Sequence, residues 1–401
     1  VLSSMEREGV AIDTEFFAQM SKNLEQRLNE LEKAVYEIAG EPFNVNSTQQ
    51  LSEVLFDKLG LPTRGLRKTK SGYYSTAAGV LEDLRDADET GIIELVLEHR
   101  ELSKLKGTYV DALPELVNEE TRRIHSSFNQ TGSVTGRIAS SSPNLQNIPV
   151  RSDVGMRIRR GFVAREGWWI LAADYSQVEL RILAHVCKDE AMMEAFRRDQ
   201  DIHRATAAAV YGVDIDDVTY QQRQFAKNVN FGLIYGMGAY RLARESGLTL
   251  AEAENYIKEY FERFPGIEDY LERTKRQARE KGFVETLLGR RRYFPIFQAR
   301  SRVNREMVAR SEREAINHPI QGTAADIIKI AMIRLDKRLE EGGFRARMIL
   351  QIHDELLLEV PDDELEQVRD LVMDVMCNAF DIDVPLKVEV STGRNWLELK
   401  L

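Results

Sequence analysis

Cysteine, zinc-binding patterns and long apolar runs are scarce or missing in this 401-residue sequence. Its two cysteines, Cys187 and Cys377, lie far apart without metal-ligand spacing, which predicts reduced core residues in a cytoplasmic protein. The six histidines show no zinc spacing either. No apolar run approaches the roughly 18 residues that a membrane helix needs, and no signal-peptide pattern opens the chain. We therefore expect neither a disulfide-rich secreted protein nor a zinc protein, and no membrane partner.

Further absences narrow the chemistry. The sequence has no GxxxxGK[ST] loop, which argues against an ordinary ATPase or GTPase, and no Ser-His-Asp or Cys-His spacing for nucleophilic catalysis. The net charge of −10 lacks the basic excess of many nucleic-acid binders. Phosphate contacts are local, however, and basic clusters at 67–70, 157–160 and 290–292 are either solvated surface or phosphate contacts. The first methionine is Met5, which suggests a fragment of a longer protein.

The length predicts about two to four lobes, and the first quarter of the chain is predicted to be helical. Residues 14–40 have the apolar spacing of a long amphipathic helix. Ser47 is placed to cap a second helix at 48–59, and helices resume until about residue 105. Residues 62–76 are rich in Gly, Ser, Lys and Arg, which predicts a mobile basic loop.

Strands are predicted near the middle and the end of the chain. Residues 124–130 predict a short strand, and the polar stretch at 131–149 has the composition of a linker. Residues 168–173 form an apolar run typical of a buried strand, and this run ends at Asp174. Late in the chain, two apolar runs flank His353-Asp354-Glu355 and predict a β-hairpin.

Asp174, Asp354 and Glu355 are carboxylates in apolar surroundings, where a charge is costly unless something compensates it. Taken singly, each is better explained by a turn at the edge of a sheet. Two such positions at the ends of buried strands favour a shared metal site. Two divalent ions about 3.5–4 Å apart can activate an attacking hydroxyl and stabilise a leaving pyrophosphate. Without zinc spacing, an oxygen-binding ion such as Mg²⁺ is favoured.

A segment at residues 223–236 has the pattern of a substrate-binding helix. It carries four side chains at intervals of four: Arg223, Lys227, Phe231 and Tyr235. On an α-helix these share one face over about 18 Å. The cations match the phosphates of an extended nucleoside triphosphate, and the rings match its sugar and base. The alternative is an ordinary amphipathic helix with core aromatics. Gly232 and Gly236 favour the substrate helix, because each costs about 1 kcal/mol in a helix interior and so indicates a close approach or a bend.

These residues resemble motifs of the bacterial DNA polymerase I family, the A family of DNA polymerases. Asp174–Arg181 (DYSQVELR) is similar to its first palm motif, the row at 223–236 to its fingers motif, and His353-Asp354-Glu355 to its second palm motif. Three further segments match in the same order: TGRIASSSPNLQNIP at 135–149, Asp201-Ile202-His203, and QGTAAD at 321–326. Order and spacing agree along essentially the whole chain.

The resemblance implies an α+β, right-hand polymerase fold, with an antiparallel palm sheet and a mostly helical thumb and fingers. The implied boundaries are an N-terminal lead-in at 1–19, a thumb at 20–125, a palm at 126–184 and 328–401, and fingers at 185–327. Family members usually carry an exonuclease-like domain, and often a 5′-nuclease domain, before this region. The resemblance therefore predicts neither proofreading nor 5′-nuclease activity from this chain.

The resemblance also implies roles for single residues. Asp174 and Asp354 would hold two Mg²⁺ ions, for which Mn²⁺ could substitute, with the carbonyl of Tyr175 assisting and Glu355 as a supporting carboxylate. Lys227 could also protonate the leaving pyrophosphate. The expected nucleotide-binding residues are Gln177, Glu179, His203, Arg223, Lys227, Phe231 and Tyr235, with Glu179 excluding ribonucleotides. The expected DNA contacts, largely in the minor groove near the primer end, are Arg137, Asn147, Arg151, Gln321, Gln351 and His353.

The predicted function is template-directed DNA polymerisation in replication and repair: a primer 3′-hydroxyl attacks the α-phosphate of a deoxynucleoside triphosphate. The expected partners are primer–template DNA and deoxynucleoside triphosphates, bound by a monomer in the bacterial cytoplasm at the nucleoid. Three alternatives stay open: substantial reverse transcriptase activity, a non-catalytic DNA-binding derivative, and a two-metal nuclease. Glu179 favours deoxynucleotide substrates but does not distinguish a DNA template from an RNA template.

Overall fold

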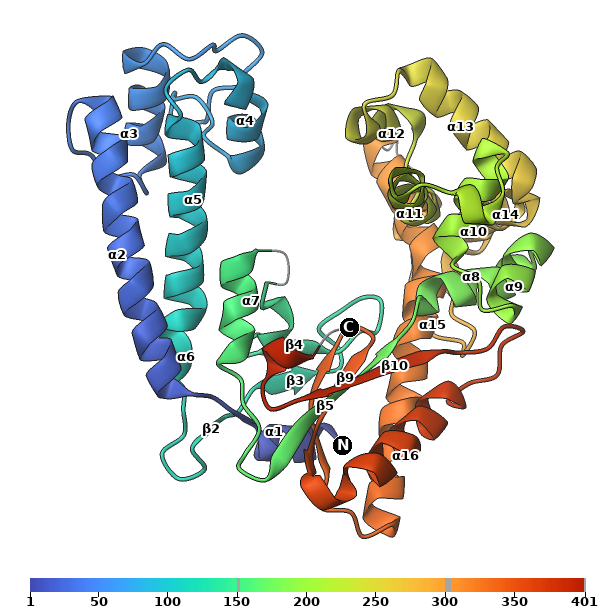
Figure 1. Ribbon diagram of the computed structural model, residues 1–401. Coiled ribbons are helices and arrows are strands. Elements are labelled where there is room, and N and C mark those ends of the chain that lie inside the picture. The colour runs from blue at the N-terminus through green and yellow to red at the C-terminus, as the bar shows by residue number, and fades with distance from the viewer. Residues whose placement is uncertain (150–151, 300–303, 400–401) are drawn as a thin grey trace.

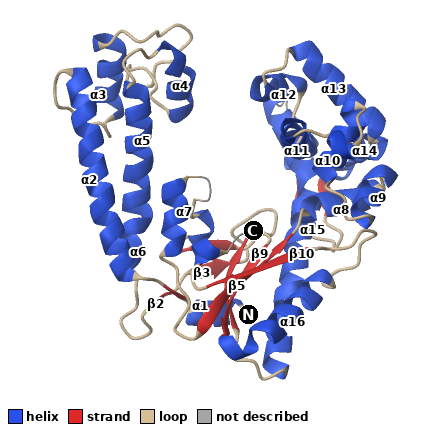
Figure 2. Cartoon of the chain, viewed as in Figure 1, coloured by secondary structure: helices blue, strands red, loops and turns tan. Residues whose placement is uncertain are grey.

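A small antiparallel sheet joins two largely helical lobes in this protein, whose computed structural model describes residues 1–149, 152–299 and 304–399 (Figure 1). Most strands gather at the junction of the lobes (Figure 2). The predicted α+β class is confirmed. The helices are α1 Leu2–Glu8, α2 Thr14–Ala39, α3 Thr48–Ser52, α4 Ala78–Asp83, α5 Ile92–Leu105, α6 Ala112–Glu115, α7 Asp153–Arg160, α8 Val178–Cys187, α9 Glu190–Arg197, α10 Ile202–Tyr211, α11 Tyr220–Ile234, α12 Ala239–Ser246, α13 Leu250–Arg263, α14 Pro265–Lys281, α15 Arg305–Glu341 and α16 Leu365–Cys377. The strands are β1 Val10–Ala11, β2 Arg123–Ile124, β3 Ser127–Asn129, β4 Ala139–Ser141, β5 Trp168–Tyr175, β6 Phe283–Glu285, β7 Arg291–Tyr293, β8 Arg347–Ile352, β9 Glu355–Pro361 and β10 Val388–Gly393.

The central sheet has the strand order β10-β5-β9-β8, and each neighbouring pair is antiparallel. The strand predicted before Asp174 is β5, and the predicted hairpin is formed by β8 and β9. Both predictions are confirmed. The hairpin turns at His353, whose backbone has a left-handed φ of 54°. This turn places Asp354 directly before β9, at the same end of the sheet as the end of β5.

Side chains of β5 alternate between two hydrophobic cores. Ala173 and Tyr175 belong to the core that includes α15 and α16, whereas Ile170 and Ala172 belong to the core that includes α2 and α7. Successive side chains of a strand point to opposite faces. Asp174 therefore lies on the face of Ile170 and Ala172, and both faces of its strand are packed against helices.

One helical lobe contains α2 to α6 and confirms the prediction of a helical first quarter. The side chain of Asp13 caps α2 by accepting from the backbone of Phe16 at 2.9 Å, and Gly40 ends α2 with a left-handed φ of 74°. Ser47 caps α3, as predicted. The helix predicted at 48–59 is only partly regular, because residues 53–58 continue as a π-helical turn.

The second lobe contains α8 to α14 and the first part of α15, the longest described helix with 37 residues. α15 runs without a break through the predicted boundary between residues 327 and 328, and the boundaries remain predictions. Pro319 lies inside α15, where the hydroxyl of Thr323 donates to its carbonyl oxygen at 2.6 Å. No helix in the described part of the chain is long and apolar enough to cross a membrane.

The interpretation of residues 131–149 as a linker was wrong. β4 lies in this stretch and pairs with β3. The single strand predicted at 124–130 is also divided in two: β2 pairs with β1, and β3 pairs with β4. The hydroxyls of Ser126 and Ser140 are buried and hydrogen-bonded to each other at 2.7 Å. The amide of Gln146 donates to the carbonyl of Ile138 at 3.1 Å and to that of Gln351 on β8 at 3.0 Å. A polar segment can be buried because its polar groups satisfy one another.

The third basic cluster and the two cysteines have ordinary structural surroundings. In the third cluster, Arg290 binds Asp326 at 2.6 Å, and Arg292 lies at 2.5 Å from Glu314. These arginines are thus engaged in ion pairs within the fold rather than free. Cys187 is buried, and Cys377 is half-buried against the same core.

A buried ion network on β9 yields a stability prediction. Glu359 is 1% exposed and accepts from Arg123 at 2.7 Å and from Arg165 at 2.8 Å. Burial alone would raise the pKa of Glu359, but hydrogen bonds from both arginines hold it below its usual value. Glu359→Gln should lower the free energy of unfolding by about 3 kcal/mol, since two arginines lose their buried counter-charge. Denaturant unfolding at pH 7 measures this.

The matched control is Glu98→Gln, because Glu98 also pairs with an arginine, Arg27, but on the exposed surface. Its loss should stay below about 1 kcal/mol. The difference between the two variants should shrink as the pH falls below 4.5, where Glu359 is protonated in the unfolded state and then also in the folded state. Equal losses in both variants at pH 7 would show that the buried network is not stabilising.

Candidate active site

One cavity of about 410 Å³ lies where the sheet meets α8, α10 and α11. Residues from separate sequence motifs line it together. They are Arg137, Asp174, Tyr175, Gln177, Val178, Glu179, His203, Arg223, Lys227, Phe231, Tyr235, His353 and Asp354. The fold therefore brings most of the predicted site residues to one place.

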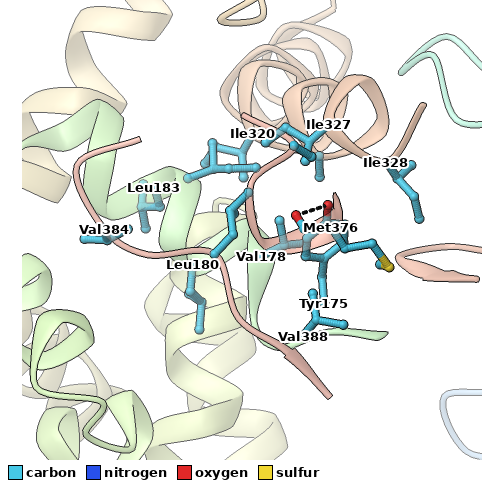
Figure 3. Close-up of a cluster of buried hydrophobic side chains, with 14 of the residues drawn as sticks. Tyr175, Val178, Leu180, Leu183, Ile320, Ile327, Ile328, Met376, Val384 and Val388 are labelled. Atoms are coloured by element: carbon cyan, nitrogen blue, oxygen red, sulfur yellow. Dashed lines mark hydrogen bonds between the residues drawn. The ribbon is translucent and has the colours of Figure 1, made fainter. Parts of the chain in front are cut away.

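Asp174 and Asp354 meet at the end of the central sheet. Asp174 pairs with Glu355 in the ladder between β5 and β9, and the N–H of Tyr175 donates to the carbonyl oxygen of Asp354 at 3.2 Å. The side chain of Tyr175 points into the core, where its hydroxyl donates to the carbonyl of Met376 at 2.8 Å (Figure 3). This anchor fixes the end of β5, so the two aspartates are held together at the cavity.

The carboxylates at this strand end have elevated pKa values. Burial raises the pKa of Asp174 to about 7, and the charges of Asp354 and Glu389 add to the effect. Burial and the charge of Asp174 raise the pKa of Glu355 to about 7, although Arg159 opposes them. Burial raises the pKa of Asp354 too. The protein thus concentrates negative charge here without enough positive charge to balance it.

A divalent cation with oxygen ligands fits this donor set. Buried carboxylates with raised pKa values bind a proton for want of a counter-charge, and a metal ion can take the place of that proton. Among the described residues, no three His, Cys, Asp or Glu side chains lie close enough together to hold an ion by themselves. Water and substrate oxygens would complete the coordination, as Mg²⁺ prefers.

α11 presents the predicted row of side chains to the cavity. Thr219 starts the helix with a capping box, and Arg223, Lys227 and Phe231 line the cavity from successive turns. Tyr235 also lines the cavity, but it is the residue after the last helical position. The predicted row is therefore confirmed in space, although the helix ends before its last member.

The two glycines of this segment are required for different structural reasons. Gly232 lies inside α11, where a Cβ would come within 2.1 Å of the side chain of Met237, so the predicted close approach is confirmed. The placement of Gly236 in a helix interior was wrong. It follows the end of α11 with a left-handed φ of 73°, which glycine adopts at no steric cost, and packs against Arg313.

Positive and hydrogen-bonding groups gather at the α10 end of the cavity. Arg223 donates through Nε to Oδ2 of Asp201 at 2.6 Å, and the other oxygen of Asp201 caps α10. Lys227 is exposed and has no ion-pair or hydrogen-bond partner among the described residues. His203 is only 2% exposed, and burial lowers its pKa to about 4, so the ring is neutral at pH 7.

A profile of DNA polymerase family A matches residues 14–398. The chain belongs to this family. It is 52% identical over 400 residues to a thermostable DNA polymerase I of Thermus filiformis, covering 100% of this chain and 47% of that protein. It is 50% identical to DNA polymerase I of Pseudomonas aeruginosa, covering 99% of this chain and 43% of that protein. The chain thus spans about half the length of these relatives.

A solved structure agrees with the fold of this family A chain. The polymerase domain of Pol1 from M. smegmatis, solved in complex with DNA primer-template and dNTP, superposes with a TM-score of 0.92 at 42% identity. The match covers 99% of this chain and 69% of that one. The predicted right-hand fold of thumb, palm and fingers is confirmed.

One end of the cavity in this family A chain is closed by a buried acidic side chain. Glu179 is 9% exposed and accepts from Arg137 at 2.7 Å and from the hydroxyl of Tyr235. Burial raises the pKa of Glu179, although Tyr235 and Arg137 oppose the effect. Glu179 therefore links α8, the end of α11 and the loop of Arg137 across the cavity.

Some predicted site residues do not line the cavity. Glu355 lies beside Asp174 in the ladder, Asn147 is exposed, and Gln351 is 3% exposed, with its amide donating to the carbonyl of His353. Gln321 approaches the hydroxyl of Tyr235 from α15. Arg151 lies outside the described residues.

Three polar residues of the site were missed by sequence reasoning. Glu389 on β10 pairs with Asp174 in the ladder, Asp201 binds Arg223, and Asn230 contacts His203. Asp201 stands in the Asp-Ile-His motif, which could have drawn attention to it. Asn230 is a polar residue on the buried side of α11, next to Phe231, and this position was its signal. For Glu389, the sequence shows only the alternation of side chains along a strand, which does not distinguish it from its neighbours.

Proposed function

We propose that this chain is a template-directed DNA polymerase, which adds deoxynucleoside triphosphates to a primer 3′-hydroxyl and releases pyrophosphate. The convergence of Asp174 and Asp354 with Arg223 and Lys227 on one cavity carries the proposal. Because the M. smegmatis relative is described with DNA primer-template and dNTP, it supports the same two partners here. In this proposal the lobe of α2–α6 is the thumb (20–125). The central sheet belongs to the palm (126–184 and 328–401), and the other lobe is the fingers (185–327).

Asp174 and Asp354 would hold two Mg²⁺ ions, or Mn²⁺ in their place, with help from the carbonyl of Tyr175. When bound, the ions would activate the primer hydroxyl and stabilise the charge on the leaving pyrophosphate. Glu355 would keep the strand end negative. Burial and Asp174 raise the pKa of Glu355 to about 7 in spite of Arg159. The positive charge of the bound ions would therefore be needed to favour its ionised form.

The nucleotide would lie along α11. Arg223, Lys227 and neutral His203 would donate to the triphosphate, while Phe231 and Tyr235 would pack against sugar and base. Gln177 would line the same pocket. The buried carboxylate of Glu179, fixed by two hydrogen bonds, would occupy the space that a ribose 2′-hydroxyl needs.

The DNA would be bound near the primer end, largely in the minor groove, where the acceptors are alike for all base pairs. The proposed DNA contacts are Arg137, Asn147, Arg151, Gln321, Gln351 and His353.

Primer extension on matched DNA and RNA templates tests the proposal. With Mg²⁺ and all four deoxynucleotides, the chain should extend a labelled primer on DNA. Comparable extension on RNA would favour a reverse transcriptase. A sample without nucleotides should show no shortening, because shortening would indicate a two-metal nuclease. Binding of primer–template without any extension would contradict the proposal and leave a non-catalytic DNA-binding protein.

Phe231 provides a prediction about sugar recognition. Its ring carries no hydroxyl, so the pocket must rely on the 3′-hydroxyl of the substrate itself. Dideoxynucleotides should be poor substrates, and Phe231→Tyr should improve their relative use by about 10- to 100-fold, the worth of one hydrogen bond in a buried site. Competition between a dideoxynucleotide and its deoxynucleotide measures the ratio. Phe225→Tyr, on the same helix but outside the cavity lining, is the control. An unchanged ratio in Phe231→Tyr would refute the proposed position of the sugar.

A further inference from the structure

Asn230 is a fully buried amide in the interior of α11. Its side chain is 0% exposed, and its Nδ2 lies 3.1 Å from Nδ1 of His203 and 3.0 Å from Oγ1 of Thr206. Its Oδ1 is buried and has no hydrogen-bond partner among the described residues. Burying an unsatisfied carbonyl is unfavourable, and an apolar side chain would fill this position without that cost. Packing alone therefore does not account for Asn230.

The hydrogen bonds around Asn230 define the direction of each donor. The hydroxyl of Thr206 donates to the carbonyl of Ile202 at 2.8 Å, so its oxygen is left to accept from Asn230. Reversing the amide would put Oδ1 against a hydroxyl whose proton is already engaged. Nδ2 therefore faces both partners. Since an amide nitrogen only donates, Nδ1 of His203 must accept. The single N–H proton of the neutral imidazole ring is therefore on Nε2.

Burial, helped by two nearby cations, keeps the ring of His203 neutral. Asp201 precedes it on α10, while Arg223 and Lys227 face it from α11; burial and the two cations outweigh the aspartate and lower its pKa to about 4. A neutral imidazole has one donor, here Nε2–H. Nε2 has no partner among the described residues, and His203 lines the cavity next to Arg223 and Lys227. Its one donor is therefore available at the cationic end of the cavity.

We propose that Asn230 is a positioning residue that holds His203 in the Nε2–H tautomer, so that this ring donates to the triphosphate instead of presenting a lone pair to it. The proposal rests on the proposed function for its ligand, but not for its geometry. A neutral histidine without Asn230 would populate both tautomers. In the Nδ1–H tautomer the Nε2 lone pair would face phosphate oxygens and repel them. Asn230 thus acts on the substrate through His203 and without touching it.

Nitrogen NMR of ¹⁵N-histidine-labelled protein tests the tautomer directly, because it needs no nucleotide. The signals of His203 are assigned as those lost in His203→Gln. The wild type should show the neutral Nε2–H tautomer from pH 6 to pH 8, and Asn230→Leu should show a mixture of tautomers. Asn228→Leu, an exposed asparagine on the same helix, should leave the signals unchanged. A wild-type Nδ1–H or imidazolium form, or an unchanged tautomer in Asn230→Leu, would overturn the proposal.

Kinetics then separate positioning from general damage to the fold. Asn230→Leu should raise the KM for the incoming nucleotide about tenfold, the effect of one lost hydrogen bond to a charged group, with primer–template affinity unchanged. In a His203→Ala background, Asn230→Leu should add no further increase, because the two residues act on the substrate as one unit. Additive increases would contradict the proposal. If the wild type extends no primer, the proposed function fails, and the NMR result still decides whether Asn230 fixes the tautomer.

Discussion

Asp174→Asn is expected to abolish primer extension and also to make the protein more stable. The loss of a proposed metal ligand should lower single-turnover extension by about 10³-fold or more, since bound ions would stabilise the transition state by several kcal/mol. The gain follows from the raised pKa of Asp174, about 7 against 3.8. A carboxyl that is harder to ionise in the folded state destabilises it, here by about 2–4 kcal/mol above pH 7.

The sign of this stability effect gives the prediction a pH signature. Below 3.8 Asp174 is protonated in both states, so the variant should gain nothing. As pH rises through the window from 3.8 to about 7, the unfolded wild type loses its proton first, and the stability of the wild type falls relative to the variant. Thermal unfolding without metal, from pH 4 to pH 8, measures the difference. Added Mg²⁺ should stabilise the wild type more than the variant.

Asp354→Asn should behave similarly, because burial raises the pKa of Asp354 too. The matched control is Asp381→Asn, since Asp381 is exposed and has no hydrogen-bond or ion-pair partner in the described part of the chain. It should change neither extension nor stability. Primer–template binding should persist in all three variants. Retained extension in Asp174→Asn or Asp354→Asn would contradict the proposed roles.

Lys227→Ala is expected to slow the chemical step as well as weaken nucleotide binding. Lys227 lines the cavity, is exposed, and has no counter-charge among the described residues, so its ammonium is available to the triphosphate. If it also protonates the leaving pyrophosphate, the single-turnover rate at saturating nucleotide should fall about 10²- to 10⁴-fold, the range of general acid catalysis. Rapid-quench incorporation of one nucleotide measures binding and chemistry separately.

Lys227→Arg separates the charge of Lys227 from its proton. Arginine keeps the positive charge but does not give up a proton in proteins. The variant should therefore bind nucleotide much better than Lys227→Ala yet react slowly. A full chemical rate in Lys227→Arg would refute proton donation and leave electrostatic binding alone. Reduced binding with an unchanged chemical step in Lys227→Ala would lead to the same conclusion.

Local patterns in the sequence were sufficient for the elements that position the site. The apolar run before Asp174 and the two runs around Asp354 each bury a strand, so their composition determines their structure. The four-residue spacing of α11 similarly placed Arg223, Lys227 and Phe231 on one face. What these patterns did not provide was the proximity of Asp174 and Asp354. The antiparallel pairing of β5 with β9 brings both to the same end of the sheet, and this pairing depends on tertiary packing.

The predictions that were wrong or incomplete also depend on tertiary contacts that local sequence patterns do not contain. Residues 131–149 are polar enough for a linker. They are nevertheless partly buried and regular, because serines and Gln146 bind one another and nearby carbonyls. Gly236 follows a helix end that the apolar pattern does not mark. Asn230 and Asp201 bind side chains from another helix. Their sequence positions could draw attention to them, but no pattern within one helix identifies those partners.

The central claim is that Asp174 and Asp354 together hold the two ions of a templated nucleotide transfer. Counting Mn²⁺ by electron paramagnetic resonance tests it most directly, in a complex with dideoxy-terminated primer, template and the complementary nucleotide. We predict two bound ions per wild-type chain, fewer in Asp354→Asn, and wild-type binding in Asp381→Asn. Two ions retained in Asp354→Asn, or none in the wild type, would contradict the claim.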